Sequence, residues 1–153
     1  MNKKQKSLTN KGFSLVELII VIAIMAVLVG VLAPQFLKYV ERSRKATDVD
    51  NMQAVITAIQ VYAADPVVES ADRLTASKNA TLTFASTGLT VAGDNATAVG
   101  KALTSASLTA ANIKTKSEAY SSVAVTVEVD ASGVPSFSTT SEDLAKELGI
   151  TKK

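Results

Sequence analysis

The strongest constraint on this chain is a run of twenty residues, 18–37, that contains no charged side chain. Gly30, Pro34 and Gln35 alone interrupt its apolar character. About 20 apolar residues are enough for a helix to cross the hydrocarbon core of a bilayer. Glu17 directly precedes this run, where a carboxylate that faces lipid is costly unless it is paired with another polar or charged group. The sequence therefore predicts a membrane-spanning segment with one acidic group that needs a functional explanation.

Composition and charge exclude several classes of protein. Four of the sixteen basic residues precede Phe13, which leaves twelve against fourteen acids, a net charge of −2, beyond Gly12. This balance argues against nucleic-acid binding by the main domain. The chain has no Cys and no His, which excludes thiolate chemistry, disulfides and the usual zinc sites. No serine has the lysine spacing of a Ser-x-x-Lys nucleophile. We therefore expect a protein that is not an enzyme and has no cofactor, catalytic or metal site.

Residues 1–12 form a basic leader, and short lysine-rich flanks stay on the cytoplasmic side of a membrane segment. Its basic residues are Lys3, Lys4, Lys6 and Lys11. A secretory signal would be cut beyond the apolar run, but Ala33 there is followed by Pro34, and a bond to proline is a poor peptidase substrate. Gly12 is the small residue on the near side. A cut after Gly12 would leave the apolar segment as the new N-terminus.

The segment 12–20, GFSLVELII, resembles the prepilin signal of type IV pilins and of the pseudopilins of secretion and competence systems. The resemblance covers about the first third of the chain. It implies that a prepilin peptidase cuts between Gly12 and Phe13 and methylates the α-amine of Phe13. It further implies that Glu17 neutralises the N-terminal amine of an adjacent subunit, a pairing favoured at low dielectric. The alternative is a simple signal anchor whose glutamate lies among the lipid headgroups.

Gly30 and Pro34 act on the same helical turn, because Pro34 cannot donate to the carbonyl of Gly30. A bent or locally extended segment is expected there if neighbouring subunits satisfy the freed groups. The resemblance implies that this stretch can unwind in a filament. The other interpretation is an ordinary proline kink in a membrane helix, and the two are compatible.

Residues 38–65 are predicted to continue the helix in amphipathic form, since Asp65 precedes Pro66 and helices seldom continue into such a pair. Apolar residues recur there at steps of three and four: Met52, Val55, Ile56, Ile59 and Tyr62 with Ala63. This stripe needs a partner, and a sheet from the C-terminal part is expected to cover it. The charges of 38–50 are interpreted as a solvated face, with pairing between subunits, through Arg44 or Asp48, as the alternative.

Residues 66–153 are predicted to form a small head, which makes the fold α+β: a long N-terminal helix packed against an antiparallel β-rich domain. The expected strands are 81–84, 89–91, 122–129 and 134–139, with a loop as the alternative for the first. A short helix is expected within 94–113 and another after Ser141, capped by Gly149. Asn79 and Asn95 each begin an Asn-x-Thr sequence, the pattern of N-glycan acceptors.

These features divide the chain into a leader (1–12), an apolar assembly helix (13–37), its amphipathic continuation (38–65) and a head (66–153). The resemblance implies a structural subunit of a type IV pilus, with roles such as adhesion and twitching motility. It would reside in the cytoplasmic membrane, N-terminus inside, before joining a homo-oligomeric filament at the cell surface. Its partners would be the prepilin peptidase and methyltransferase and an assembly platform with a motor ATPase.

A pseudopilin is the alternative, and nucleic acid would be a partner only if that pseudopilin served DNA uptake. A membrane-anchored binding protein that never polymerises is a third interpretation. The absence of Cys departs from many Gram-negative pilins, which close a C-terminal loop with a disulfide.

Overall fold

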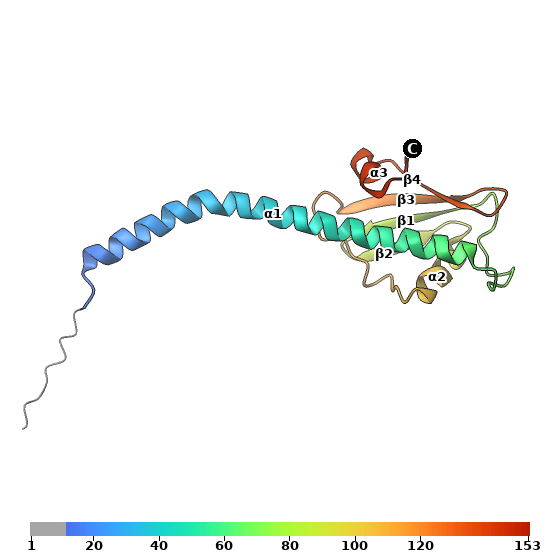
Figure 1. Cartoon of the computed structure of the whole chain (residues 1–153), viewed down its shortest axis with the longest axis horizontal. Helices are drawn as coiled ribbons and strands as arrows, with labels where there is room; N and C mark the ends of the chain where they lie inside the picture. The colour runs from blue at the N-terminus through green and yellow to red at the C-terminus, as the bar shows by residue number, and fades with distance from the viewer. Residues whose placement is uncertain (1–11) are drawn as a thin grey trace, which may run out of the picture. The chain divides into compact units, whose positions relative to one another are not determined.

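The computed structural model describes residues 12–153, so residues 1–11 of the leader lie outside it. The chain divides into two compact units, of which the first ends at Tyr39 and the second spans Val40–Lys153. A single helix, α1 (Leu15–Ala64), belongs to both (Figure 1). This long helix and the β-rich head that follows it confirm the predicted α+β fold.

Helix α1 ends where the sequence predicts, because Pro66 cannot continue it. The chain turns at Asp65, whose amide donates to the carbonyl of Tyr62 at 3.3 Å. The Asp65 carboxylate then accepts from the amide of Val67 at 2.9 Å. The carboxylate thus stabilises the turn that leads the chain away from the helix.

The head is built on one sheet of five strands in the order β2-β1-β3-β4-β5. The strands are β1 (Asn79–Ala85), β2 (Gly88–Ala92), β3 (Ser122–Val129), β4 (Pro135–Thr139) and β5 (Thr151–Lys152). All neighbouring pairs are antiparallel except β4 and β5, which are parallel. The strands expected from the alternating pattern are confirmed. The short C-terminal β5, with two residues, was not predicted.

Two short helices complete the head, α2 (Ala96–Ser105) and α3 (Glu142–Leu148). Helix α2 is shorter than the range 94–113, because the chain turns at Ser107, which has a φ of 58°. Helix α3 begins and ends as predicted. The Ser141 hydroxyl accepts from the amide of Leu144, and Gly149 takes the left-handed conformation with a φ of 65°.

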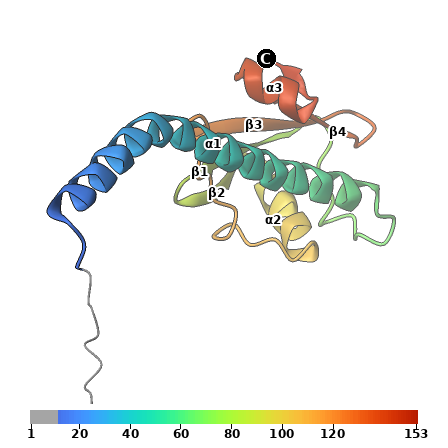
Figure 2. The ribbon, with the colours of Figure 1, turned by 60° about the vertical axis from the view of Figure 1, so that its left-hand side comes forward.

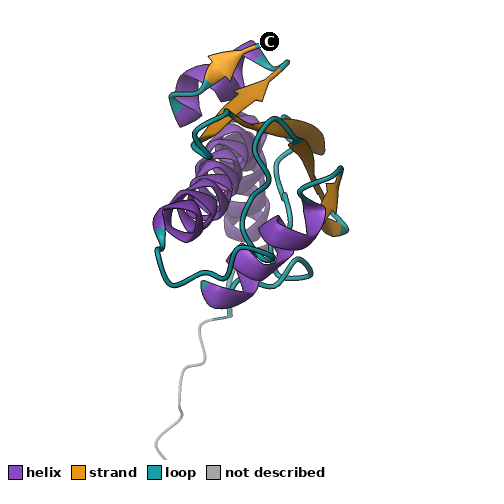
Figure 3. Cartoon of the chain, turned by 90° about the vertical axis from the view of Figure 1, so that its right-hand side faces the viewer, coloured by secondary structure: helices purple, strands orange, loops and turns teal. Residues whose placement is uncertain are grey.

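The core lies between residues 40–64 of α1 and one face of the sheet, with α2 and α3 on either side of the helix (Figures 2 and 3). Alternate residues of β1 and β3, such as Leu82 and Val125, point into it and are fully buried. The helix contributes the predicted stripe, of which Met52, Val55, Ile56 and Ile59 are buried. Burying side chains of this size stabilises a domain by about 1.5–3 kcal/mol each.

The helix also makes polar contacts with the head, and here the interpretation of 38–50 as a solvated face is wrong for Asp48. Asp48 is 1% exposed. Its carboxylate accepts from the amides of Lys116 and Ser117 at 2.8–3.0 Å and from the Ser117 hydroxyl at 2.6 Å. A buried carboxylate is tolerated when hydrogen bonds replace its water. Asp48 therefore serves contacts within the chain and is unavailable for pairing between subunits.

Two further residues on the same side of α1 extend this polar contact. Glu41 accepts from the amide of Glu118 at 2.6 Å. Lys45 forms an ion pair with Glu147 at 2.8 Å, and its ammonium lies 5.3 Å from the ring centre of Tyr120. The Tyr120 hydroxyl donates to Glu147 at 2.9 Å. Glu41, Lys45 and Asp48, which we call the polar clamp, thus bind the helix to residues 116–120 and to α3.

The contact between Lys45, Tyr120 and Glu147 shifts the pKa values of all three groups. The hydrogen bond from Lys45 holds the pKa of Glu147 below its usual value, and the Tyr120 hydroxyl adds to this effect. Its bond to Glu147 raises the pKa of Lys45 in return. Burial raises the pKa of Tyr120. The ionised pair is therefore the favoured state near neutral pH.

Asn95, in the second Asn-x-Thr sequence, has a structural role. It is buried, and its side-chain amide bridges the chain before β1 to the start of α2. The oxygen accepts from Thr75 at 2.8 Å, and the nitrogen donates to the carbonyls of Thr75 and Lys78 at 3.1 Å. A glycan on this nitrogen would replace one of its two N–H groups and so remove one of these bonds. Asn79, in the first such sequence, is exposed at the start of β1.

Candidate processing and assembly segment

The candidate cleavage point, between Gly12 and Phe13, lies just before helix α1. Residues 12–14 have no regular secondary structure, and the helix begins at Leu15. Phe13 is 92% exposed, and a methyl group at Gly12 would meet nothing within 4 Å. The peptide bond is therefore in open, non-helical backbone, which is the form that a peptidase can take into an extended binding site.

Glu17 is held by the first turn of the helix. Its carboxylate accepts from the amide of Ser14 at 2.9 Å, and the Ser14 hydroxyl accepts from the amide of Val16 at 3.3 Å. This is close to a capping box, in which a serine and a glutamate three residues later satisfy free amides at a helix start. The Ser-x-x-Glu spacing at 14–17 is the signal by which the sequence alone could have revealed this contact, which we had not predicted.

This capping contact leaves most of the bonding capacity of the carboxylate free. An ionised carboxylate has two oxygens and about four acceptor positions, and one of these is used by Ser14. Glu17 is also the sole charged side chain in residues 12–37. The carboxylate can therefore accept a cationic group from outside without losing its place at the helix start.

The apolar half of α1 has no partner in the described part of the chain. Its large side chains, from Leu15 to Leu37, are 51–73% exposed. An 18-residue window of the helix is apolar enough to cross a membrane, and none of that window is buried. Isolated apolar surface of this extent marks a lipid or protein contact. The segment is thus suited to a bilayer or to a bundle of similar helices.

Gly30 and Pro34 both lie inside α1, which is helical on either side of them. A methyl group at Gly30 would meet nothing within 4 Å. The carbonyl of Gly30 has no amide donor at Pro34. The turn between the two residues therefore lacks one backbone hydrogen bond that its neighbours can make. Whether it unwinds in an assembly stays a prediction.

Comparison with known proteins places the similarity in this same segment. Residues 8–33 match the family described as the prokaryotic N-terminal methylation motif. The chain is 41% identical over 49 residues to the type IV major pilin protein PilA of Myxococcus xanthus, covering 32% of this chain and 22% of that protein. It is 40% identical over 60 residues to the prepilin peptidase-dependent protein A of Clostridium perfringens, covering 39% of this chain and 42% of that protein.

The matched segments thus span about a fifth and about two fifths of these two relatives. No solved structure matches the chain significantly. Among residues 12–153, no group of three His, Cys, Asp or Glu side chains could hold a metal ion. The methylation motif, the two relatives and the long apolar helix all point to the same part of the chain. The N-terminal third of this chain is similar to a type IV major pilin and to a prepilin peptidase-dependent protein.

Proposed function

We propose that the chain is the structural subunit of a type IV pilus filament that polymerises through its N-terminal helix. The observation that carries this proposal is the exposed apolar half of α1, most of which lies within the methylation motif. A helix with such a surface is stable in the membrane before assembly and against identical helices afterwards. The head, which is held by its own core, would form the surface of the filament. The subunit would have a mechanical role and no catalytic one.

In this proposal, a prepilin peptidase cuts between Gly12 and Phe13 and methylates the α-amine of Phe13. Removal of the basic leader creates one cation at the start of the apolar helix. Its counter-ion would be Glu17 of an adjacent subunit, because a charge in an apolar fibre core must be paired. Glu17 can accept this amine while it keeps the Ser14 amide. The pair would fix which turn of one helix meets the start of the next.

The turn between Gly30 and Pro34 would unwind when the helix packs into the fibre. Its missing hydrogen bond makes local unwinding cheaper there than elsewhere in α1. The work of extension would come from a separate motor ATPase at an assembly platform in the membrane. The chain itself supplies the cleavable leader, the assembly helix and the head.

The location of the processed protein tests this proposal against the pseudopilin alternative. Cells are sheared, and the chain without its leader is quantified in the sheared fraction and in the envelope. Abundant processed protein in the sheared fraction is expected for a pilus subunit. Processed protein that stays in the envelope would instead indicate a pseudopilin, and a chain that keeps its leader would contradict both.

A further inference from the structure

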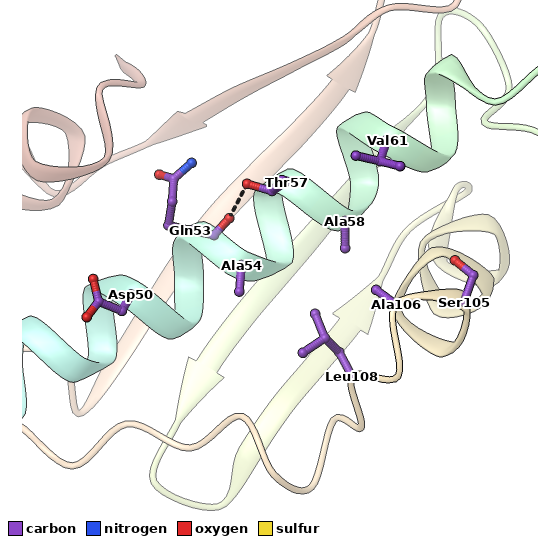
Figure 4. A pocket seen from close by; sticks show the side chains of 9 residues that line it. All are labelled: Asp50, Gln53, Ala54, Thr57, Ala58, Val61, Ser105, Ala106 and Leu108. Atoms are coloured by element: carbon purple, nitrogen blue, oxygen red, sulfur yellow. Dashed lines mark hydrogen bonds between the residues drawn. The ribbon is translucent and has the colours of Figure 1, made fainter.

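An open groove runs along α1 in the head, between the helix and the segment that ends α2 and follows it. Its volume is about 570 Å³. One wall is formed by helix residues and the other by Ser105, Ala106 and Leu108. Figure 4 shows Ala54 and Ala58 directed across the groove toward Ala106 and Leu108. The helix residues that line it are Asp50, Gln53, Ala54, Thr57, Ala58 and Val61.

The groove exists because its lining side chains are small. Ala54, Ala58 and Ala106 leave space that longer side chains would fill, and Val61 remains 65% exposed beside them. Small residues at steps of four allow the backbone of another helix to approach closely. The groove is therefore shaped for a helix, in contrast to the core side of α1, which is already covered.

The charges around the groove define what fits it. Asp50 is the one charged residue among the nine that line it. Arg42 and Lys45 line a different recess, with Glu147. A basic helix would find a single acid here, and a charged helix would lose its hydration without pairing. The groove favours an uncharged, apolar helix, and residues 18–37 of this chain are such a helix, exposed and without a partner.

The spacing of residues on the two surfaces also agrees. Along the groove, Asp50, Ala54, Thr57 and Val61 follow steps of four, three and four. Because residues 18–37 are uncharged on every side, that helix can present apolar or small residues at the same steps, for example Ile19, Ile22, Ala26, Val29 and Ala33. Two helices that share this spacing can pack side by side with their side chains interdigitated.

We propose that the groove between α1 and residues 105–108 receives the apolar helix of a second copy of this chain. The inference rests on the proposed function, since the second copy arrives by polymerisation. It adds a specific contact site on the head: the apolar helix of one subunit contacts Ala54, Ala106 and Leu108 of another, beside Ala58, which is only 7% exposed. Assembly would then join the head of one copy to the membrane segment of the next.

Cysteine pairs test this contact cleanly, because the natural chain has no cysteine. Ala54→Cys is combined in the full chain with Ala26→Cys, Val29→Cys or Ala33→Cys, one at a time. Whole cells are oxidised, and covalent dimers are measured in the sheared and envelope fractions. The matched controls replace Ala54→Cys by Gln60→Cys, an exposed position on the same helix that does not line the groove. At least one Ala54 combination should give dimers well above its Gln60 control.

A second pair of variants fills the groove. Ala54→Leu should lower the amount of sheared filament about tenfold or more, because overpacking of a fitted contact is costly, while Gln60→Leu should leave it unchanged. Both variants should be processed as the parent chain is.

Dimers no more abundant than in the controls, together with normal assembly of Ala54→Leu, would overturn the groove contact while leaving the pilus proposal intact. A parent chain that never reaches the sheared fraction would contradict the pilus proposal instead. The dimers in the envelope would then still decide whether the groove binds a second copy.

Discussion

The two halves of α1 differ in where their side chains find partners. In the half up to Leu37, the apolar side chains are exposed and Glu17 is the sole charge. In the half from Glu41 to Tyr62, the apolar stripe is covered by the sheet, and the polar clamp is satisfied by residues 116–120 and α3. The side chains of the second half therefore find their partners within one chain, whereas those of the first half can find partners only in a membrane or an assembly.

The comparison predicts opposite consequences for changes in the two halves. Changes in the first half should alter assembly without altering the stability of the head. Changes in the second half should alter the stability of the head first.

Glu17→Ala should remove most filament assembly, because an unpaired amine in the fibre core would cost about 3–5 kcal/mol. The expected loss of sheared filament is about a hundredfold or more. The level of protein in the membrane and the unfolding of its head should match the parent chain. Val16→Ala, in the same helical turn, is the control. Normal filaments from Glu17→Ala would break the proposed pairing.

Ile59→Ala should destabilise the head by about 3 kcal/mol, because it opens a cavity at a fully buried position. Its control is Val61→Ala, two residues away and mostly exposed, which should change stability by about 0.5 kcal/mol or less. Denaturant unfolding of the full chain in detergent, followed by tyrosine fluorescence, measures both. Equal effects of the two variants would contradict the assigned core face of α1.

Asp48→Ala should cost about 2–3 kcal/mol, since it leaves the amides of Lys116 and Ser117 without their charged acceptor. Asp50→Ala, on the groove side, should leave the stability of the head nearly unchanged. Unfolding under the same conditions compares the two. A loss of assembly with unchanged head stability in Asp48→Ala would return this residue to the group of intersubunit contacts.

The Lys45 and Glu147 pair should have the smallest effect, about 1 kcal/mol or less, because both side chains are partly exposed. The lowered pKa of Glu147 means that its contribution is lost as pH falls through the folded-state value. The raised pKa of Lys45 means that its contribution is lost as pH rises through the folded-state value. The pair should therefore contribute most between about pH 5 and pH 10. A double-mutant cycle with Lys45→Met and Glu147→Gln, measured inside this window and on both sides of it, tests the pair. A coupling energy that is the same inside and outside the window would contradict the ion pair.

The sequence could predict those elements that depend on local pattern. Strand β3 alternates apolar and polar residues, and α3 has a serine before it and a glycine after it, so both were predicted with their limits. The buried stripe of α1 followed from steps of three and four residues. In each case the determining residues are close together in the sequence.

Features that depend on distant residues could not be predicted in this way. The partners of Asp48 are 68 and 69 residues away, so its spacing on α1 resembled that of a solvated charge. Strand β5 has two residues and exists because β4 offers it an edge. The second wall of the groove comes from residues 105–108, which nothing in the helix sequence indicates.

The most direct test of the central claim is the intact mass and N-terminal peptide of the chain in filaments sheared from the cell surface. We expect a chain that begins at Phe13 with a methylated α-amine and lacks residues 1–12. A chain that still begins at Met1 would contradict it, because the apolar half of α1 could then not present the amine that Glu17 is proposed to neutralise.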